Sequence, residues 1–201
     1  MGRWVVVIDN MESRVSRWLV EEYCEAARVA EAAGLELYIS GLVTPELEAV
    51  LARRGVRLLG DSGVCNRPDS ILLDLWAEKT LDPGEVWGAR CFIIGGIMGD
   101  HPPRGRTRLL YDRYPYAARR NLGRLQFSID GAVKMLAKVL SGMRVEEVEI
   151  AYPAVIELRG PLGSFTVELP YAYPLEGGRP WVAEGVVRLL ERGIVWDEEL
   201  L

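Results

Sequence analysis

Histidine and cysteine are scarce in this 201-residue sequence, which limits the metal chemistry it can carry. His101 is the only histidine, so a histidine-based zinc cluster cannot be assembled. The three cysteines, Cys24, Cys65 and Cys91, stand far apart in no metal-like spacing. An odd number of dispersed cysteines is typical of buried thiols. The sequence therefore predicts no metal site and no disulfide.

Long hydrophobic runs are also missing near the start of the sequence. The first apolar run, WVVVI at residues 4–8, ends at Asp9 and is too short for a signal peptide or a membrane span. We therefore expect a cytoplasmic protein. With 49% hydrophobic and 26% charged residues, the composition predicts a packed core in one large domain or in one domain with a small appendage.

Lysine and side-chain amides are rare: the chain has 3 Lys against 21 Arg, one Gln and three Asn. Few amides and many charges are a compositional hint of a thermophile. The net charge of −5 disfavours a general nucleic-acid binder. Residues 100–124 nevertheless hold seven Arg and two Asp, whereas the remainder has a net charge of −10. This arginine-rich segment is a candidate RNA contact or an ordinary charged surface.

Apolar runs and turn residues predict an alternation of strands and helices up to residue 150. The expected strands are 4–9, 35–40, 56–60, 70–74, 91–96 and 116–120. The expected helices are 13–34, 45–54, 104–113 and 129–140, with Ser13 and Ser128 as N-caps of the first and the last. Such alternation predicts an α/β fold with a mostly parallel sheet and helices on both faces.

After residue 150 the pattern changes. Two strand-like runs around Gly-Pro-Leu-Gly predict a hairpin at 154–169. A proline-rich connector, a final helix near 182–193 and the acidic residues 196–201 follow. We therefore expect a first domain at 1–150 and a small hairpin and helix extension at 151–201 that packs on it.

Three predicted strand ends carry unusual residues: 74–76, 95–100 and the 121–130 stretch that leads into a capped helix. In open parallel sheets, ligands bind beyond the carboxyl ends of the strands. The sequence lacks the P-loop pattern for a nucleoside triphosphate. It also lacks Gly-x-Gly-x-x-Gly, because Ile94 stands where the first glycine would be. A Rossmann dinucleotide site is therefore disfavoured.

The motifs GGIMGDHPPRGRT (95–107) and RRNLGRLQFSIDGAVKM (119–135) resemble a small family of SPOUT-class methyltransferases. The beginning VIDNMES and the later ELPYAYP extend the resemblance over nearly the whole chain. The family includes archaeal predicted RNA methyltransferases and a fungal protein-arginine methyltransferase that acts on a small-subunit ribosomal protein. The resemblance implies a C-terminal trefoil knot in the α/β domain and S-adenosylmethionine as the cofactor.

By this resemblance, the knot loops and the last helix of the first domain hold the cofactor. The glycines are expected to let the chain approach it closely or adopt positive φ, whereas Trp76 is either a core residue or a cofactor wall. The implied cofactor residues are Leu73, Asp74, Leu75, Trp76, Gly95, Gly96, Ile97, Gly99, Leu122, Gly123, Leu125, Ser128 and Ala132.

The acceptor site is expected beside these loops. Asp100 is the first candidate for a carboxylate that orients the acceptor, although it could instead cap a helix or pair with a neighbouring arginine. Glu12 and Asp9 are further candidate acids. His101, Arg104 and Arg106 are candidate substrate-binding residues, with turn formation or solvated ion pairing as the alternatives.

Three functions fit the sequence. The first is methylation of an arginine in a basic ribosomal protein, which the acidic bulk of the chain favours. The second is methylation of rRNA or tRNA, favoured by the arginine-rich segment. The third is a non-catalytic module that binds the cofactor or the ribosome. A monomer or a homodimer fits each of them.

Overall fold

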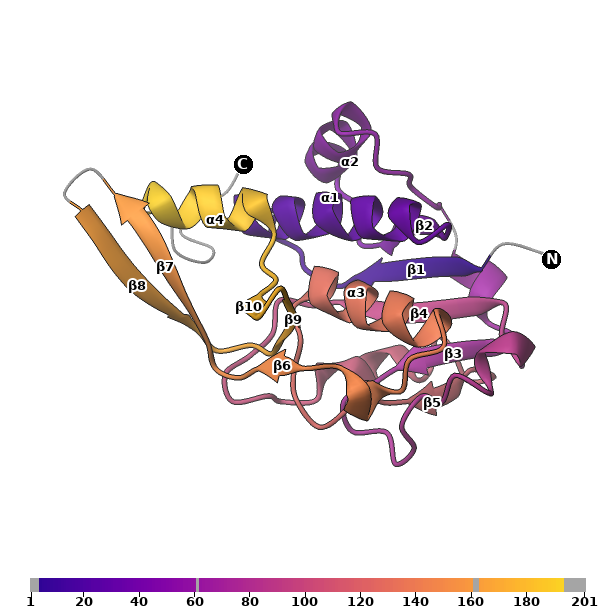
Figure 1. Ribbon diagram of the computed structural model, residues 1–201. Helices are drawn as coiled ribbons and strands as arrows, with labels where there is room; N and C mark the ends of the chain where they lie inside the picture. The colour runs from indigo at the N-terminus through magenta and orange to yellow at the C-terminus, as the bar shows by residue number, and fades with distance from the viewer. Residues whose placement is uncertain (1–3, 61, 161–162, 194–201) are drawn as a thin grey trace.

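The computed structural model describes residues 4–60, 62–160 and 163–193. Its centre is a five-stranded sheet with the order β2-β1-β4-β3-β5, in which every neighbouring pair is parallel (Figure 1). The strands are β1 (Val5–Asn10), β2 (Glu36–Gly41), β3 (Ser70–Leu73), β4 (Cys91–Gly96) and β5 (Ala118–Arg120). The predicted mostly parallel α/β sheet is confirmed.

The two faces of the sheet are covered differently. The α-helices α1 (Arg17–Ala32), α2 (Pro45–Arg53) and α3 (Ile129–Leu140) share one hydrophobic core with strand residues such as Val6 and Ile8. Side chains alternate across a strand, so Val7 faces the other side. There it packs with Leu110 and Tyr114 in a second core. That core includes the 3₁₀-helices η1 (Ser62–Cys65) and η3 (Arg106–Leu110), and the further 3₁₀-helices are η2 (Val86–Gly88) and η4 (Val145–Glu147).

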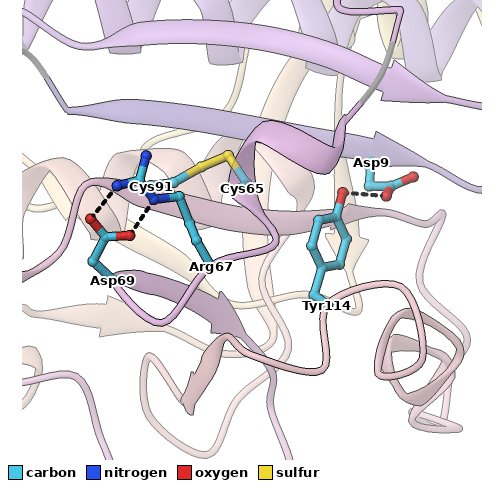
Figure 2. Close-up of a disulfide and its surroundings, with 6 residues drawn as sticks. All are labelled: Asp9, Cys65, Arg67, Asp69, Cys91 and Tyr114. Carbon is cyan, nitrogen blue, oxygen red and sulfur yellow. Dashed lines mark hydrogen bonds and ion pairs between the residues drawn. A yellow bond between two sulfur atoms is a disulfide. The ribbon is translucent and has the colours of Figure 1, made fainter.

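A disulfide joins Cys65 of η1 to Cys91 at the start of β4 on this second face (Figure 2). The prediction of three thiols was therefore wrong for two of them, while Cys24 is a half-buried free thiol. The two Cα atoms are 5.6 Å apart, within the usual range for a disulfide. The pairing joins residues 26 positions apart that only the packing of η1 onto β4 brings together.

Several element boundaries differ from the sequence-based expectation. Helix α1 begins at Arg17 because Ser16, not Ser13, is its N-cap and accepts a hydrogen bond from the Leu19 amide at 3.1 Å. Residues 56–60 form no full strand and make a single bridge between Leu58 and Ile39. The predicted helix at 104–113 is the shorter 3₁₀-helix η3. Helix α3 begins after Ser128, as predicted.

The C-terminal part contains the predicted hairpin, β7 (Ala154–Gly160) and β8 (Gly163–Leu169), and the predicted last helix, α4 (Glu184–Glu191). The short strands β6 (Ile150–Ala151), β9 (Tyr173–Glu176) and β10 (Arg179–Pro180) form an antiparallel sheet with the order β10-β9-β6. Figure 1 shows the hairpin extending outwards beside α4.

The C-terminal elements pack on the first part of the chain through Trp18 of α1, which joins a hydrophobic core with Leu158 and Leu189. The acidic residues 196–201 lie outside the described residues. No helix in the described ranges is long and apolar enough to cross a membrane.

Candidate active site

A pocket opens at the carboxyl edge of the parallel sheet, where ligands of such sheets usually bind. Three segments form it: the loop after β3, the end of β4 with the loop that follows, and the stretch that leads into α3. Among its lining residues are the predicted cofactor residues Leu73, Asp74, Leu75, Trp76, Gly95, Ile97, Gly99, Leu122, Gly123, Leu125, Ser128 and Ala132. The fold thus brings the three predicted strand ends together.

Gly96 is the predicted cofactor residue that does not line the pocket. A Cβ atom at this position would lie 2.4 Å from the Tyr23 hydroxyl oxygen and 2.8 Å from the Cα atom of Asn10. Gly96 is therefore required for the close packing of β4 against β1 and α1. Alternate residues of a strand face opposite sides, so Gly96 faces away from the side on which Gly95 lines the pocket, and its role toward the cofactor stays a prediction.

Two pocket glycines have the left-handed backbone conformation that favours glycine, namely Gly105 with a φ of 68° and Gly123 with a φ of 99°. Gly95 and Gly99 do not belong to this group. At Gly99 the restriction is steric, since a Cβ atom there would lie 2.8 Å from the Tyr171 ring. The Tyr171 hydroxyl donates a hydrogen bond to the Gly99 carbonyl at 2.6 Å. Gly99 thus allows the C-terminal part to contact the pocket loop.

Trp76 is a wall of the pocket and not a core residue, because it is 51% exposed. Its indole lies against the backbone at Gly105, where an added Cβ atom would be 2.9 Å from the indole nitrogen. The loop after β3 and the segment before η3 therefore meet at this point, and the absence of a side chain at Gly105 allows their contact.

Asp74 is buried at the floor of the pocket and anchors two segments. Its carboxylate accepts hydrogen bonds from the Tyr111 hydroxyl and from the Trp76 amide, the latter at 3.2 Å. Burial, followed by the hydrogen bond to Asp74, raises the pKa of Tyr111, so that Tyr111 remains a neutral donor. The Arg119 guanidinium lies over the Tyr111 ring, 3.6 Å from its centroid. No motif or spacing in the sequence singles out Tyr111.

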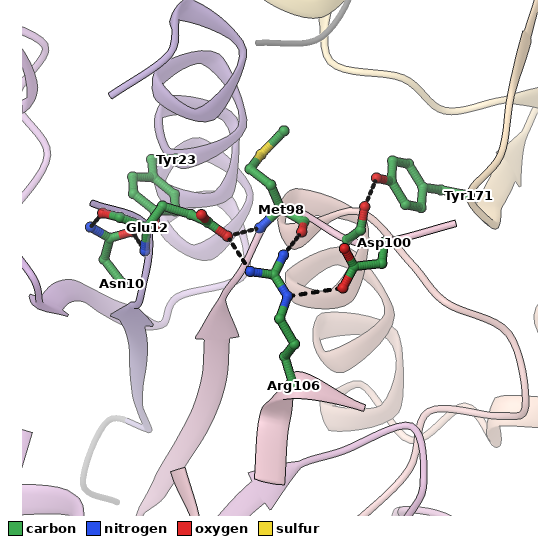
Figure 3. Close-up of polar contacts among 8 residues, drawn as sticks. Asn10, Glu12, Tyr23, Met98, Asp100, Arg106 and Tyr171 are labelled. Carbon is green, nitrogen blue, oxygen red and sulfur yellow. Dashed lines mark hydrogen bonds and ion pairs between the residues drawn. The ribbon is translucent and has the colours of Figure 1, made fainter. Parts of the chain in front are cut away.

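Two of the three predicted acceptor acids, Glu12 and Asp100, converge on Arg106 (Figure 3). Arg106 Nη1 donates to Glu12 Oε1 at 3.1 Å, and its Nε lies 3.0 Å from Asp100 Oδ2. Its Nη2 donates to the Met98 carbonyl oxygen. We call the Glu12 carboxylate, the Asp100 carboxylate and the Met98 carbonyl the arginine cage. Asp100 and Arg106 also line the pocket.

Glu12 is held in place by its neighbours. It accepts a hydrogen bond from the Met98 amide at 2.9 Å, and its own amide donates to Asn10 Oδ1 at 3.2 Å. The buried Asn10 also accepts a hydrogen bond from Tyr23 at 2.7 Å. Burial raises the pKa of Tyr23 well above its ordinary value, with the charge of Glu22 as the next cause, so Tyr23 remains a donor. These contacts fix the position of the Glu12 backbone.

The other candidate acceptor residues lie elsewhere. Asp9 is fully buried on the second face of the sheet and accepts a hydrogen bond from Tyr114 at 2.6 Å (Figure 2). It also accepts a hydrogen bond from Arg113. Asp9 does not line the pocket. His101 is exposed and outside the lining, whereas Arg104 lines the pocket.

The sequence has four residues with side-chain amides, and three of them support the loops of the site. The sequence analysis did not single out these three residues. Asn10 positions Glu12, and Gln126 lines the pocket and donates to the Asp100 carbonyl at 3.3 Å. The buried Asn121 donates to the Ala77 carbonyl at 2.8 Å and accepts from the Thr80 hydroxyl at 2.9 Å. Their rarity was an available signal, because a chain with few amides keeps them where a donor and an acceptor are both needed.

In the described ranges, no group of three or more His, Cys, Asp or Glu side chains is arranged to hold a metal ion. The site is instead built from backbone, apolar side chains, carboxylates and arginines. A parallel sheet with a pocket formed by three loops at its carboxyl edge is the arrangement of a ligand-binding α/β protein. Dual-specific Trm10 from Thermococcus kodakaraensis shares the fold, with a TM-score of 0.53 and 16% identity over 73% of this chain and 96% of that one.

Residues 5–196 match the family described as protein arginine N-methyltransferase SFM1-like, and the chain belongs to that family. It is 30% identical to protein arginine N-methyltransferase SFM1 of Saccharomyces cerevisiae, over 92% of this chain and 93% of the yeast protein. The crystal structure of the yeast arginine methyltransferase SFM1 complexed with SAM superposes with a TM-score of 0.82, at 26% identity, over 96% of this chain and 92% of that one.

Proposed function

We propose that this protein binds S-adenosylmethionine in the pocket and transfers its methyl group to an arginine side chain of a protein. The observation that carries the acceptor assignment is the arginine cage, in which Glu12 and Asp100 converge on a guanidinium beside the pocket. The yeast relative SFM1 is an arginine methyltransferase with solved SAM and SAH complexes, and this likeness supports both the cofactor and the activity.

The residues present fit this cofactor. Leu73, Leu122, Leu125 and Ala132 supply apolar walls suited to an adenine ring, and the loops between them offer backbone donors and acceptors. The glycines in the pocket lining carry no side chain that would fill the space needed by the cofactor. Arg104 lies on the same lining and provides a charge for the polar end of such a ligand.

When bound, S-adenosylmethionine supplies a methyl group on a sulfonium. The role of the protein is then to align an acceptor nitrogen with this methyl group. Good orientation of the reacting groups lowers an activation barrier by roughly 7–11 kcal/mol. An arginine guanidinium stays protonated, with a pKa above about 12. Glu12 and Asp100 would hold it by charge-assisted hydrogen bonds. Asp100, on the pocket lining, would accept its proton as the N–C bond forms and the methyl–sulfur bond breaks, with S-adenosylhomocysteine as the leaving group.

Cofactor binding is tested first, by calorimetry with S-adenosylhomocysteine. Ala132→Leu places a larger side chain on the pocket lining and is expected to abolish binding. Ala137→Leu is the matched control, because Ala137 lies on α3 away from this pocket. Binding by wild type and Ala137→Leu, with loss in Ala132→Leu, supports the site. Normal binding by Ala132→Leu would exclude this pocket.

The acceptor is tested by incubating the protein with methyl-labelled cofactor and ribosomes. We infer that the acceptor is a basic ribosomal protein, because the chain is acidic outside residues 100–124. The label is expected to follow protein, to survive ribonuclease and to appear as monomethylarginine after hydrolysis. Release of the label as modified nucleosides would overturn the arginine acceptor.

RNA methylation is the second candidate, and the surface beside the pocket favours it. Arg104, Arg108, Arg119 and Arg124 are exposed and have no carboxylate partner among the described residues. The exposed Trp76 and the Arg119–Tyr111 stack lie among them, as in surfaces that bind single-stranded RNA. The ribonuclease step of the labelling experiment separates the two candidates.

Two further parts of the proposal concern the knot and the location. The Asn121 amide donates to the Lys79 carbonyl at 2.8 Å and its carbonyl accepts from Leu81 at 2.9 Å, so the stretch that leads into α3 lies against the loop after β3. We propose that these two segments are part of a trefoil knot. A cytoplasmic location is compatible with the Cys65–Cys91 disulfide if the protein comes from a thermophile, as its composition suggests.

A further inference from the structure

We propose that Arg106 occupies the acceptor site of the free protein and that the substrate arginine binds by displacing it. This inference rests on the proposed function. It assigns the arginine cage as a guanidinium-binding site and assigns Arg106 as its internal occupant.

The cage already binds a guanidinium through two hydrogen-bond acceptors, Glu12 and the Met98 carbonyl, and through an ion pair with Asp100. Glu12 approaches Arg106 from the end of β1, whereas Met98 and Asp100 belong to the loop after β4, as Figure 3 shows. The guanidinium of an acceptor arginine needs the same recognition, because it is planar and cationic and pairs with carboxylates. The two carboxylates exceed the charge of Arg106 by one, so the free cage keeps a net negative charge that attracts a second cation.

The fit of Arg106 in the cage is incomplete. Its Nε lies 3.0 Å from Asp100 Oδ2 but is not aligned for a hydrogen bond, and this buried donor has no hydrogen-bond partner. Arg120 and Glu85 show a better pair in the same chain, with two parallel hydrogen bonds of 2.7 Å each. An unpaired buried donor is unfavourable, because it has lost its hydrogen bonds to water without gaining another, and this weakens the hold on Arg106. A substrate guanidinium that enters with a free choice of orientation can satisfy all its donors.

Arg106 can leave without disturbing the core. Its side chain is 34% exposed, and the side chains of Glu12 and Asp100 are 21% and 28% exposed, so the cage borders solvent. Glu12 keeps its hydrogen bond to the Met98 amide when Arg106 departs. When Arg106 occupies the cage, the apparent dissociation constant of the substrate equals the intrinsic constant divided by the fraction of molecules with an open cage. If Arg106 occupies the cage in nine of ten molecules, the apparent dissociation constant is about 10-fold higher.

The test measures binding of methylguanidine by calorimetry, with methylurea as the neutral probe of similar shape. We expect Arg106→Ala to bind methylguanidine at least about 10-fold more tightly than wild type and to show no binding of methylurea. Arg28→Ala is the control, because Arg28 is an exposed arginine that pairs with Glu25 and does not line this pocket. It should leave the affinity unchanged. Adding Asp100→Asn to Arg106→Ala should remove the gain.

Equal or weaker methylguanidine binding by Arg106→Ala would overturn the proposal and make Arg106 part of the binding site. If Arg106→Ala does not fold, Arg106→Gln is measured by the same criterion, since it keeps part of the stem and removes the charge. With an arginine peptide as substrate, we expect the KM of the variant to fall by a similar factor without loss of kcat. A fall in kcat would assign Arg106 a positioning role instead.

Failure of this inference can be told apart from failure of the proposed function, because S-adenosylhomocysteine binding is measured on the same samples. Normal cofactor binding with unchanged methylguanidine affinity refutes the displacement of Arg106 alone. Absence of cofactor binding in every sample refutes the proposed function.

Discussion

Two carboxylate–arginine clusters begin three residues apart at the end of β1, and they lie in different surroundings. Asp9 is fully buried with Arg113 and Tyr114 on the second face of the sheet. Glu12 is 21% exposed and shares Arg106 with Asp100 beside the pocket. Both clusters pair an acid with an arginine from the 100–113 stretch, but the acid of the first is fully buried, whereas both acids of the second are partly exposed. Burial therefore separates a structural brace from a candidate binding site.

The two clusters also differ in what they join. The Asp9 cluster ties β1 to the 110–117 segment, on the face where the Cys65–Cys91 disulfide ties η1 to β4. Both contacts stabilise the second face, which has 3₁₀-helices and loops where the first face has α-helices. The arginine cage joins loops at the edge of the sheet. We therefore expect changes at Asp9 to affect stability and changes at Asp100 to affect turnover.

The largest expected effect is on turnover. Asp100→Asn keeps the shape of the side chain but removes the charge that holds and deprotonates the acceptor. We expect kcat to fall on the order of 10²–10⁴-fold, the usual contribution of a general acid or base, with little change in cofactor affinity. Labelled-methyl kinetics measure the change. Asp112→Asn, an exposed acid in the same segment, is the control and should retain full activity. Full activity of Asp100→Asn would leave Asp100 with a structural role.

Reduction of the Cys65–Cys91 disulfide is expected to lower the free energy of unfolding by about 3–4 kcal/mol, because the bond closes a loop between residues 26 positions apart. Urea denaturation with and without a reductant measures this loss. Cys24→Ala should show the same dependence on reductant as wild type, since Cys24 is a free thiol. Identical unfolding curves in both conditions would contradict a stabilising role for this face.

Asp9→Asn is expected to lower the free energy of unfolding by about 2–3 kcal/mol, because hydrogen bonds to a buried charged group each contribute about 1.5–3 kcal/mol and Arg113 is partly exposed. Urea denaturation is again the measurement. Asp69→Asn is a matched control, because its ion pair with Arg67 is exposed (Figure 2) and should contribute less than about 1 kcal/mol. A loss of catalysis with unchanged stability in Asp9→Asn would return Asp9 to the acceptor site.

A third acid, Asp130, sharpens the comparison because it is buried without an arginine. Its Oδ1 accepts no hydrogen bond, and burial raises its pKa from 3.8 to about 6, although hydrogen bonds from Ser128 and Gly131 oppose the rise. The folded state thus binds this proton more tightly than the unfolded state. The contribution of Asp130 to stability is full below about pH 4 and is lost as the pH rises through about 6.

Asp130→Asn should therefore flatten the dependence of stability on pH between 4 and 7. The gain at pH 8 is expected to be only about 1 kcal/mol, because the new amide also lacks partners for its donors. Melting temperatures of wild type and variant, measured at pH 4 and pH 8, provide the check. A stability of Asp130→Asn that falls with pH as steeply as that of wild type would assign the dependence to other groups.

The repeating apolar runs and caps were sufficient to predict most of the fold. Local signals were strong for β4, for α3 after its Ser128 cap and for the β7–β8 hairpin, and each lies where it was expected. They failed at residues 56–60, which are too short to pair fully with β2, and at Ser13, because Ser16 forms the cap instead. Element types follow from local periodicity, whereas boundaries depend on which competing hydrogen bond forms.

The sequence by itself determined the three strand ends of the site, because glycines and acids after apolar runs mark the carboxyl edge of a parallel sheet. Only the tertiary structure decided which side each residue faces. It placed Gly96 against Tyr23, buried Asp9 away from the pocket, joined Cys65 to Cys91 and brought Arg106 between Glu12 and Asp100. Such contacts join residues tens of positions apart, and their partners are selected by packing across the sheet, which no local pattern of residues encodes.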